Sequence, residues 1–274
     1  MSSSKVLGIL GGLGPLASAQ FLMNIYKNSS STAVSVERSE QHLPRVIMIS
    51  DPSFPDRTET LLLGNPTELV RLTEAALCSL EQMGATETLI CCLTLHAIVP
   101  LLSARLREKL ILLPDLALEE VVRNQKPVLM LSSIGARRLK IFQNSTLWND
   151  AEEFVIFPNT AEQERIHKTI YQLKLSANLE RDTLSAYRLF ESLAIKYNVD
   201  HLICGCTEFH LVSSIFSGVF SGEFSQEFSD SPSSFHNKKI IFIDPLQLAS
   251  KGLQRSSYPV PKNHSKSISA STYA

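Results

Sequence analysis

The 274-residue chain has almost no excess of charge of either sign, with 26 basic and 27 acidic residues and a formal net charge of −1. Proteins that bind nucleic acid or an anionic membrane surface usually carry a positive excess, so this balance favours neither partner. We therefore expect a small molecule as the binding partner.

Long apolar runs are also missing. The first apolar run, which begins after Lys5, is broken by Gly8, Gly11, Gly12, Gly14 and Pro15. A signal peptide needs a longer uninterrupted apolar region, and a membrane-spanning helix needs about 20 apolar residues. Since no segment meets either condition, we expect a cytoplasmic protein without a membrane partner.

Cysteines are few and poorly spaced for cross-links. Of the five, Cys91 and Cys92 are adjacent, and Cys204 and Cys206 are separated by one residue. An odd number at such spacings is unlike a disulfide framework, and it does not match the spacing of a zinc site. We expect reduced thiols and no bound metal.

Apolar segments of strand length alternate with amphipathic segments of helix length, which is typical of βαβ units and a parallel sheet. Strands are expected at residues 5–10, 45–50, 86–92, 127–131, 154–157, 200–206 and 239–245. Helices are expected at residues 16–27, 65–83, 100–106, 137–142, 159–174, 181–197 and 246–253. Composition predicts a loop at 217–237 and a disordered tail at 255–274.

Two cysteine-bearing stretches, residues 89–96 and 202–208, each close a buried strand. Ligands of open α/β sheets bind outside the carboxyl ends of the strands, so Cys92 and Cys206 are placed to face one pocket from two halves. Cys91 should point away from that pocket, because side chains alternate along a strand, whereas Cys204 shares the face of Cys206 and is a rival.

Two further segments have a functional and a structural interpretation. Gly12 and Gly14 lie in a strand-to-helix turn that could bring backbone N–H groups close to an anion, but they lack the third glycine of the dinucleotide fingerprint. A merely compact turn explains them equally well. Arg57 follows a loop stiffened by prolines and could capture a carboxylate, or it could form a surface pair with Asp56.

Five motifs occur in an order that resembles the aspartate/glutamate racemase superfamily, nearest its aspartate racemase branch. They are residues 8–15 (GILGGLGP), 55–58 (PDRT), 92–96 (CLTLH), 158–164 (P, then EQE) and 205–208 (GCTE). The resemblance extends from about Lys5 to Leu253.

The resemblance implies an α/β fold of two pseudo-symmetric parallel-sheet domains with the active site in the cleft between them. We assign residues 1–115 with 209–254 to the first domain and residues 116–208 to the second. It also implies a homodimer and racemisation without pyridoxal phosphate or any other cofactor.

By the same resemblance, Cys92 and Cys206 are the catalytic acid and base, because inverting Cα needs one proton removed from one face and another returned to the opposite face. Five positions resemble substrate-binding residues: Gly12, Arg57, Thr94, Lys174 and Thr207. Leu93 stands where the family typically has Asn, which leaves the identity of the amino-acid-like substrate open.

The sequence therefore predicts a two-cysteine racemase or epimerase. The alternatives are a single-cysteine isomerase or lyase of the same superfamily and a catalytically silent ligand-binding homologue.

Overall fold

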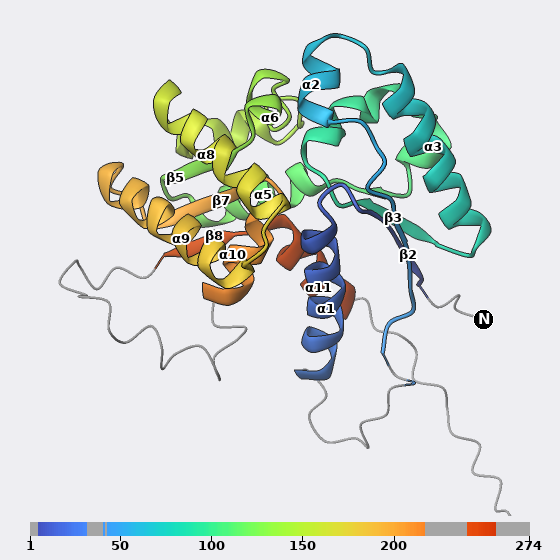
Figure 1. The fold of residues 1–274 in the computed structure, drawn as a ribbon. Coiled ribbons are helices and arrows are strands. Elements are labelled where there is room, and N and C mark those ends of the chain that lie inside the picture. Colours follow the sequence, from blue (N-terminus) through green and yellow to red (C-terminus); the bar gives the residue numbers. More distant parts are fainter. Residues whose placement is uncertain (1–4, 32–40, 42, 217–239, 256–274) are drawn as a thin grey trace, which may run out of the picture.

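The computed structural model describes residues 5–31, 41, 43–216 and 240–255, and within them the chain forms two four-stranded parallel sheets (Figure 1). The first sheet has the order β2-β1-β3-β4, with β1 (Leu7–Gly11), β2 (Val46–Ser50), β3 (Glu87–Ile90) and β4 (Leu110–Ile111). The second has the order β6-β5-β7-β8, with β5 (Val128–Ser132), β6 (Val155–Ile156), β7 (His201–Gly205) and β8 (Ile241–Ile243).

Helices connect the parallel strands, as crossover connections require. The first half contains α1 (Pro15–Ser31), α2 (Arg57–Leu62), α3 (Thr67–Gln82), the 3₁₀ helix η2 (Thr94–Leu101) and α4 (Ala104–Arg107). After α5 (Leu113–Asn124) come α6 (Ile134–Arg138), α7 (Trp148–Ala151), η3 (Glu152–Phe154), α8 (Thr160–Lys174), α9 (Leu179–Lys196), α10 (Phe209–Phe216) and α11 (Pro245–Arg255). None of these described helices is both long enough and apolar enough to cross a membrane.

The two halves have the same strand order, so each strand of the first sheet has a counterpart in the second. β3, which precedes Cys92, corresponds to β7, which precedes Cys206. The expected fold class of two parallel-sheet α/β units is confirmed.

The position of β8 differs from the expected division of the chain. Residues 209–254 were assigned to the first domain, but Ile241–Ile243 pairs with His201–Ile203 of β7 and completes the second sheet. Both helices of this segment join elements of the two halves, because α10 packs against α1 and α9, and α11 packs against α1 and α5. The physical reason is that the second sheet needs an edge strand beside β7, and β8 occupies this position. In the first sheet, β4 occupies the corresponding position beside β3.

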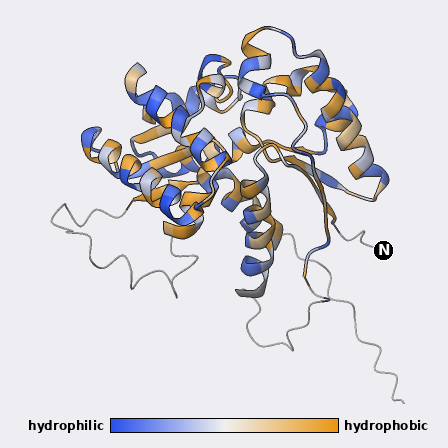
Figure 2. Cartoon of the chain, in the orientation of Figure 1, coloured by the Kyte–Doolittle hydropathy of each residue, from blue (hydrophilic) through white to orange (hydrophobic). Residues whose placement is uncertain are grey.

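Apolar residues fill three layers, and Figure 2 shows the strands and the inward faces of the helices as predominantly hydrophobic. A central cluster contains residues of both halves, among them Ile9, Leu93, Val128, Ile203 and Leu246. A second cluster packs α8 and α9 on the outer face of the second sheet, and a third packs α3 on the first. Because the central cluster is continuous, the two sheets share one core.

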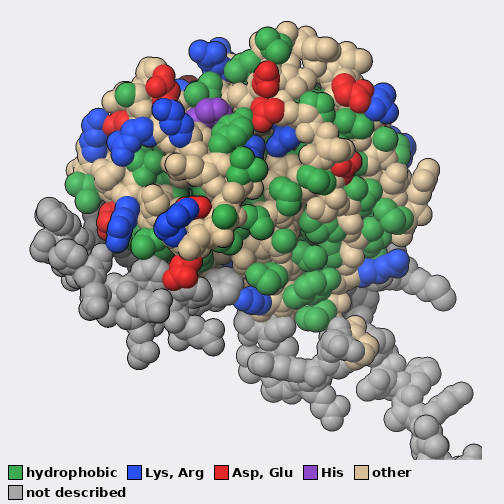
Figure 3. Space-filling view, viewed as in Figure 1, with side chains coloured by type: hydrophobic (Ala, Val, Ile, Leu, Met, Phe, Trp, Pro, Cys, Tyr) green, Lys and Arg blue, Asp and Glu red, His purple; other side chains and the backbone are tan. Residues whose placement is uncertain are grey.

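Most charged side chains lie outside these layers; Arg57, Glu162, Glu208 and Asp244 are the buried exceptions among the described residues. On the face drawn in Figure 3, basic side chains gather mainly over α8 and α9 and are interspersed with acidic and uncharged ones. This is the polar side of two amphipathic helices whose other side covers the second sheet.

The strand and helix predictions are confirmed for most elements, and the omissions are local. The sequence interpretation left out β4, α5, α7 and η3, and it assigned the start of α2 to a loop. In place of the helix expected at 100–106 the chain forms η2 and α4, and in place of the helix expected at 137–142 it forms α6, which ends at Arg138. The signal for α5 was Pro114 in its first turn, followed by Asp115, which is typical of a helix start. The predicted loop at 217–237 lies outside the described residues, as do residues 256–274 of the predicted tail.

Candidate active site

The two cysteine turns leave corresponding strands at the same edge of their sheets. Cys92 follows β3 by two residues and Cys206 follows β7 by one. Their side chains are almost completely buried, with residue exposures of 7% for Cys92 and 6% for Cys206. The two turns are in contact, because Thr207, next to Cys206, donates to the backbone oxygen of Cys91, next to Cys92 (3.3 Å), so the fold brings both predicted catalytic residues together.

Arg57 is the charged neighbour of Cys92. Its guanidinium donates to the backbone oxygens of Leu13 (2.6 Å) and Pro55 (3.0 Å), and its charge lies close enough to Cys92 to interact with the charge of that thiol. Burial acts to lower the pKa of Arg57, but attraction to Cys92 and Asp56 outweighs it and raises the pKa. Arg57 is therefore a buried cation at the site, and the surface-pair interpretation is wrong.

Glu208 is the charged neighbour of Cys206. The thiol donates to Glu208 Oε2 (2.7 Å), and the glutamate residue is only 2% exposed. Burial raises the pKa of Cys206 well above that of an ordinary thiol, and the negative charge of Glu208 raises it further. Since Glu208 faces Cys206 and Arg57 faces Cys92, the two thiols lie in opposite electrostatic environments.

The two threonines bridge the halves. Thr94 Oγ1 lies 2.9 Å from the hydroxyl oxygen of Ser133, which caps α6 of the second half. Thr207 Oγ1 donates to the backbone oxygen of Cys91 (3.3 Å) in the first half. Both predicted substrate-binding threonines thus lie where the cysteine turns meet.

Lys174 lies at the end of α8 with its ammonium group 4.0 Å from Glu208 Oε1 and 4.7 Å from the centre of the Tyr171 ring. Tyr171 in turn donates to Asp56 Oδ2 (2.8 Å), which is adjacent to Arg57. Burial, together with this hydrogen bond, raises the pKa of Tyr171. The side chain of Lys174 is therefore directed to the site, together with a tyrosine that the sequence analysis did not single out.

Gly12 has its contacts inside the protein. Its N–H donates to Ser18 Oγ (3.0 Å), and a Cβ at this position would lie 2.2 Å from the backbone nitrogen of Asp51. Its φ of +83° is one that glycine adopts readily. These contacts agree with the compact-turn interpretation.

Glu208 and Ser133 are site residues that the sequence analysis did not identify as such. Glu208 was quoted only as part of a motif; the signal that could have identified it is a carboxylate two residues after a strand-end cysteine. Leu93, by contrast, lies in the central apolar cluster and is buried. Among the described residues, no group of three His, Cys, Asp or Glu side chains is arranged to hold a metal ion.

The protein is thus a two-domain α/β protein with two parallel sheets. Each half contributes one buried free thiol to the charged region where the halves meet. The sequence model of the Asp/Glu/hydantoin racemase family matches residues 10–230. The chain therefore belongs to this family, whose members are racemases and hence isomerases.

Solved structures show the same fold. Aspartate racemase from Picrophilus torridus superposes with a TM-score of 0.69 at 22% identity, covering 92% of this chain and 94% of that one. An aspartate racemase homologue from Pyrococcus horikoshii OT3 gives 0.60 at 17% identity, covering 92% and 98%. Glutamate racemase from Campylobacter jejuni subsp. jejuni gives 0.54 at 16% identity, covering 94% and 88%.

Proposed function

We propose that this protein is a cofactor-independent racemase or epimerase that inverts Cα of an amino acid or a related acid, with Cys92 and Cys206 as the two acid–base residues. The observation that carries the proposal is the pairing of the two strand-end thiols with opposite charges, Arg57 beside Cys92 and Glu208 beside Cys206. One thiol can then start the reaction as a base and the other as an acid.

In the resting protein, burial and the charge of Glu208 raise the pKa of Cys206 and keep the proton on that thiol, so Cys206 starts as the acid, and Cys92, which lies beside the Arg57 cation, is the base. Cys92 thiolate removes the Cα proton from one face of the substrate, and the electron pair stays on the substrate as a carbanion. Cys206 then donates its proton to the opposite face and becomes the thiolate. In the reverse direction the two cysteines exchange roles.

Four cationic or hydroxyl groups suit a substrate with carboxylates. Arg57 is held with its guanidinium in the site by backbone oxygens, and it can pair with one carboxylate. The hydroxyls of Thr94 and Thr207 can donate hydrogen bonds to the α-carboxylate when they exchange their present partners, Ser133 and the Cys91 oxygen, for the substrate. Lys174, close to Glu208, can pair with a side-chain carboxylate. Gly12 lies in the turn that precedes these groups, and its place among the substrate-binding residues stays a prediction.

The aspartate and glutamate racemases among the structural neighbours support an acidic amino acid as the first substrate class to test. Access needs the two halves to separate locally, because both thiols are buried. Formation of a homodimer and a location in the cytoplasm are part of the same proposal.

The test is exchange of the Cα proton for deuterium when the protein is incubated with a panel of amino acids and related acids in deuterated water. Cys92→Ala and Cys206→Ala should each lower racemisation by on the order of 10²–10⁴-fold, which is what an acid–base group contributes. Each variant can retain exchange from the enantiomer whose proton the remaining cysteine removes.

Two variants serve as controls. Cys78→Ala, in the half-buried middle of α3, should leave the rate unchanged, and so should Cys204→Ala, because its thiol lies in the apolar layer beneath α9. If only one of Cys92 and Cys206 matters, the single-cysteine isomerase or lyase is the better assignment. If the wild type exchanges no proton with any acid, the protein is a ligand-binding homologue.

A further inference from the structure

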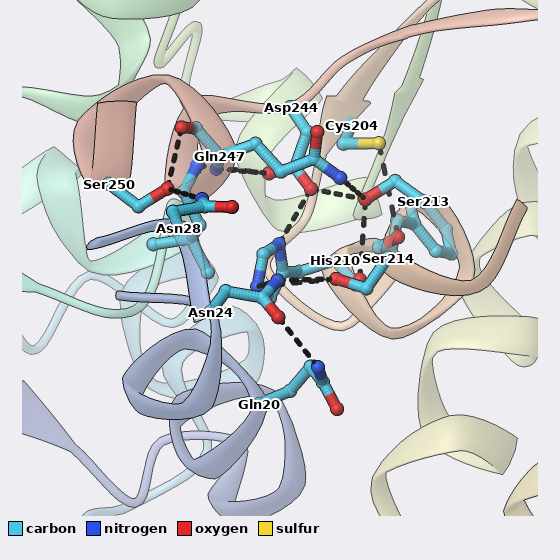
Figure 4. Close-up of polar contacts among 12 residues, drawn as sticks. Gln20, Asn24, Asn28, Cys204, His210, Ser213, Ser214, Asp244, Gln247 and Ser250 are labelled. Carbon is cyan, nitrogen blue, oxygen red and sulfur yellow. Dashed lines mark hydrogen bonds and ion pairs between the residues drawn. The ribbon is translucent and has the colours of Figure 1, made fainter. Parts of the chain in front are cut away.

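A buried polar network follows the Cys206 turn in the chain, and its side chains are drawn in Figure 4. We name it the His210 network and define it by five side chains: Asn24 of α1; His210, Ser213 and Ser214 of α10; and Asp244 between β8 and α11. None of the five is more than 2% exposed. Polar groups this deep are retained only when every one has a partner, so the network specifies a single arrangement of the three helices.

The hydrogen-bond directions in the network follow from its donors. Asn24 Nδ2 can only donate, so His210 Nε2, at 3.0 Å, must accept. His210 Nδ1 then carries the proton and donates to Asp244 Oδ2 (2.6 Å). Asn24 Oδ1 accepts from Gln20 (2.9 Å), which fixes the orientation of the amide.

Asp244 is the charged centre of the network. It accepts from His210, from the hydroxyl of Ser213 and from the backbone N–H groups of Leu246 (2.9 Å) and Gln247 (3.4 Å). Burial acts to raise the pKa of Asp244, but its interactions with His210 and Ser213 outweigh burial and lower the pKa. The carboxylate is therefore a buried anion that depends on four donors.

A Ser–His–Asp nucleophilic triad is excluded by the same contacts. Ser214 Oγ lies 3.5 Å from His210 Nε2, but it also accepts from Asn24 Nδ2 (2.8 Å). Asn24 therefore occupies the position beside the hydroxyl that a substrate would need. Ser214 and His210 are both 0% exposed, so no substrate reaches them in this arrangement. The network needs a role that buried groups can perform.

The network connects two elements that meet at the active site. The first turn of α10 is built on the catalytic turn, because the N–H of His210 donates to the oxygen of Thr207 (3.0 Å) and that of Leu211 to Glu208 (3.1 Å). At the other end, α1 begins just after Gly14, and a Cβ on Gly14 would lie 2.3 Å from Glu208 Oε1. A shift of α10 along α1 would therefore move Glu208 against Gly14 and away from Cys206.

We propose that the His210 network is a positioning device for Cys206: Asp244, acting through His210, holds α10 against α1 and so keeps the Cys206 thiol on the Glu208 carboxylate. His210 and Asp244 are positioning residues, since neither touches the reacting atoms. The kinetic part of this inference rests on the proposed racemase function, whereas the placement of Cys206 can be measured without it.

The first experiment is alkylation by iodoacetamide, with each cysteine quantified by mass spectrometry. Asp244→Asn keeps the shape of the side chain but removes the charge, and one strong hydrogen bond with it. Cys206 should then be alkylated on the order of tenfold faster, while Cys92 and Cys78 keep their wild-type rates. Ser250→Ala is the matched control, because it removes a bond between α1 and α11 (Asn28 to Ser250, 2.9 Å) and leaves α10 untouched.

The second experiment follows Cα exchange from each enantiomer of the best substrate. Asp244→Asn should lower kcat by on the order of 10- to 100-fold with little change in KM, because a misplaced catalytic group costs rate more than binding. Exchange from the enantiomer that gives its proton to Cys206 should fall more than exchange from the other. Ser250→Ala should match the wild type in both.

Unchanged alkylation of Cys206 in Asp244→Asn would overturn the inference, and so would equal acceleration at all five cysteines, which means general loosening. If Asp244→Asn does not fold, Asn24→Ala replaces it, since that change removes the donor to His210 without leaving a buried charge unpaired. Absence of Cα exchange in the wild type would count against the racemase proposal alone, because the alkylation result still decides the placement of Cys206.

Discussion

His96 is a buried base that folding holds in its neutral form. The backbone N–H of Leu113 donates to its Nε2 (3.3 Å), so Nδ1 carries the proton and donates to the oxygen of Cys92 (2.9 Å). Burial lowers the pKa of His96 from 6.5 to about 4. The residue therefore supports the backbone of the Cys92 turn and is not an acid–base partner of the thiol.

The lowered pKa of His96 predicts how stability depends on pH. The unfolded chain binds a proton at His96 below about pH 6.5 and the folded protein only below about pH 4, so this contribution to stability is complete above pH 6.5 and decreases as the pH falls to 4. The free energy of unfolding should fall by on the order of 3 kcal/mol over this interval from His96 alone.

Urea denaturation at several pH values between 7 and 4 measures this effect, with His96→Gln as the comparison, since glutamine can donate and accept but does not titrate. The variant should lose less stability than the wild type on acidification. Burial also lowers the pKa of His167, but that residue is present in both proteins and cancels in the difference. Equal losses in the two proteins would contradict the assignment.

At the scale of elements, α8 has an N-terminal cap at one end and Lys174, which points to the candidate site, at the other. Its N-terminus has a capping box, in which Asn159 accepts from the N–H of Glu162 (3.0 Å) and Glu162 accepts from the N–H of Asn159 (3.1 Å). Glu162 also pairs with Lys196 and Tyr197 of α9. The last turn carries Lys174, so the cap fixes the helix whose far end reaches the site.

Removal of the cap should lower the stability of the protein and leave the racemisation rate unchanged. Asn159→Ala leaves the N–H of Glu162 without its side-chain acceptor, and the free energy of unfolding should fall by about 1 kcal/mol. Asn159→Asp is the control, because it restores the acceptor and places a negative charge at a helix N-terminus, where it is favourable. Thermal unfolding distinguishes the three proteins. An alanine variant as stable as the wild type would show that water replaces the cap without loss.

At the scale of the whole molecule, the proposed active site is formed only where the two halves meet. Thr94 contacts Ser133, Thr207 contacts the backbone of Cys91, and Glu208 lies over Gly14. Each contact joins residues of different halves. The space over Gly14 is small, so the presence of glycine there determines how closely the halves approach.

We predict that Gly14→Ala disturbs this junction. The added Cβ would lie 2.3 Å from Glu208 Oε1, so the carboxylate that accepts from the Cys206 thiol must shift. Racemisation should fall, and the free energy of unfolding should decrease by about 1–3 kcal/mol, as for other overpacked sites.

Gly252→Ala in α11 is the matched control, since no described atom lies within 4 Å of a Cβ built there. It should leave activity unchanged and raise stability by up to about 1 kcal/mol, because alanine favours the helix. Racemisation assays and urea denaturation on both variants measure the difference. Wild-type activity in Gly14→Ala would show that the position of Glu208 is not critical.

Local patterns in the sequence predicted most of the elements and the two cysteine turns. An apolar run such as residues 200–206 has a periodicity that indicates a buried strand wherever the strand lies in the fold. The same patterns could not assign β8 to a sheet, since three apolar residues can pair with either half. They also passed over α5, whose start is marked by Pro114 and Asp115.

The sequence by itself determined that two thiols end corresponding strands of two α/β halves, because that follows from the order of apolar runs and the residues that close them. Only the tertiary structure decided what faces each thiol. Arg57 reaches Cys92 through contacts with Leu13, 44 positions earlier, and Asn24 reaches His210 across 186 positions. Such contacts depend on how the sheets pack, and local periodicity carries no information about packing between segments so far apart in the chain.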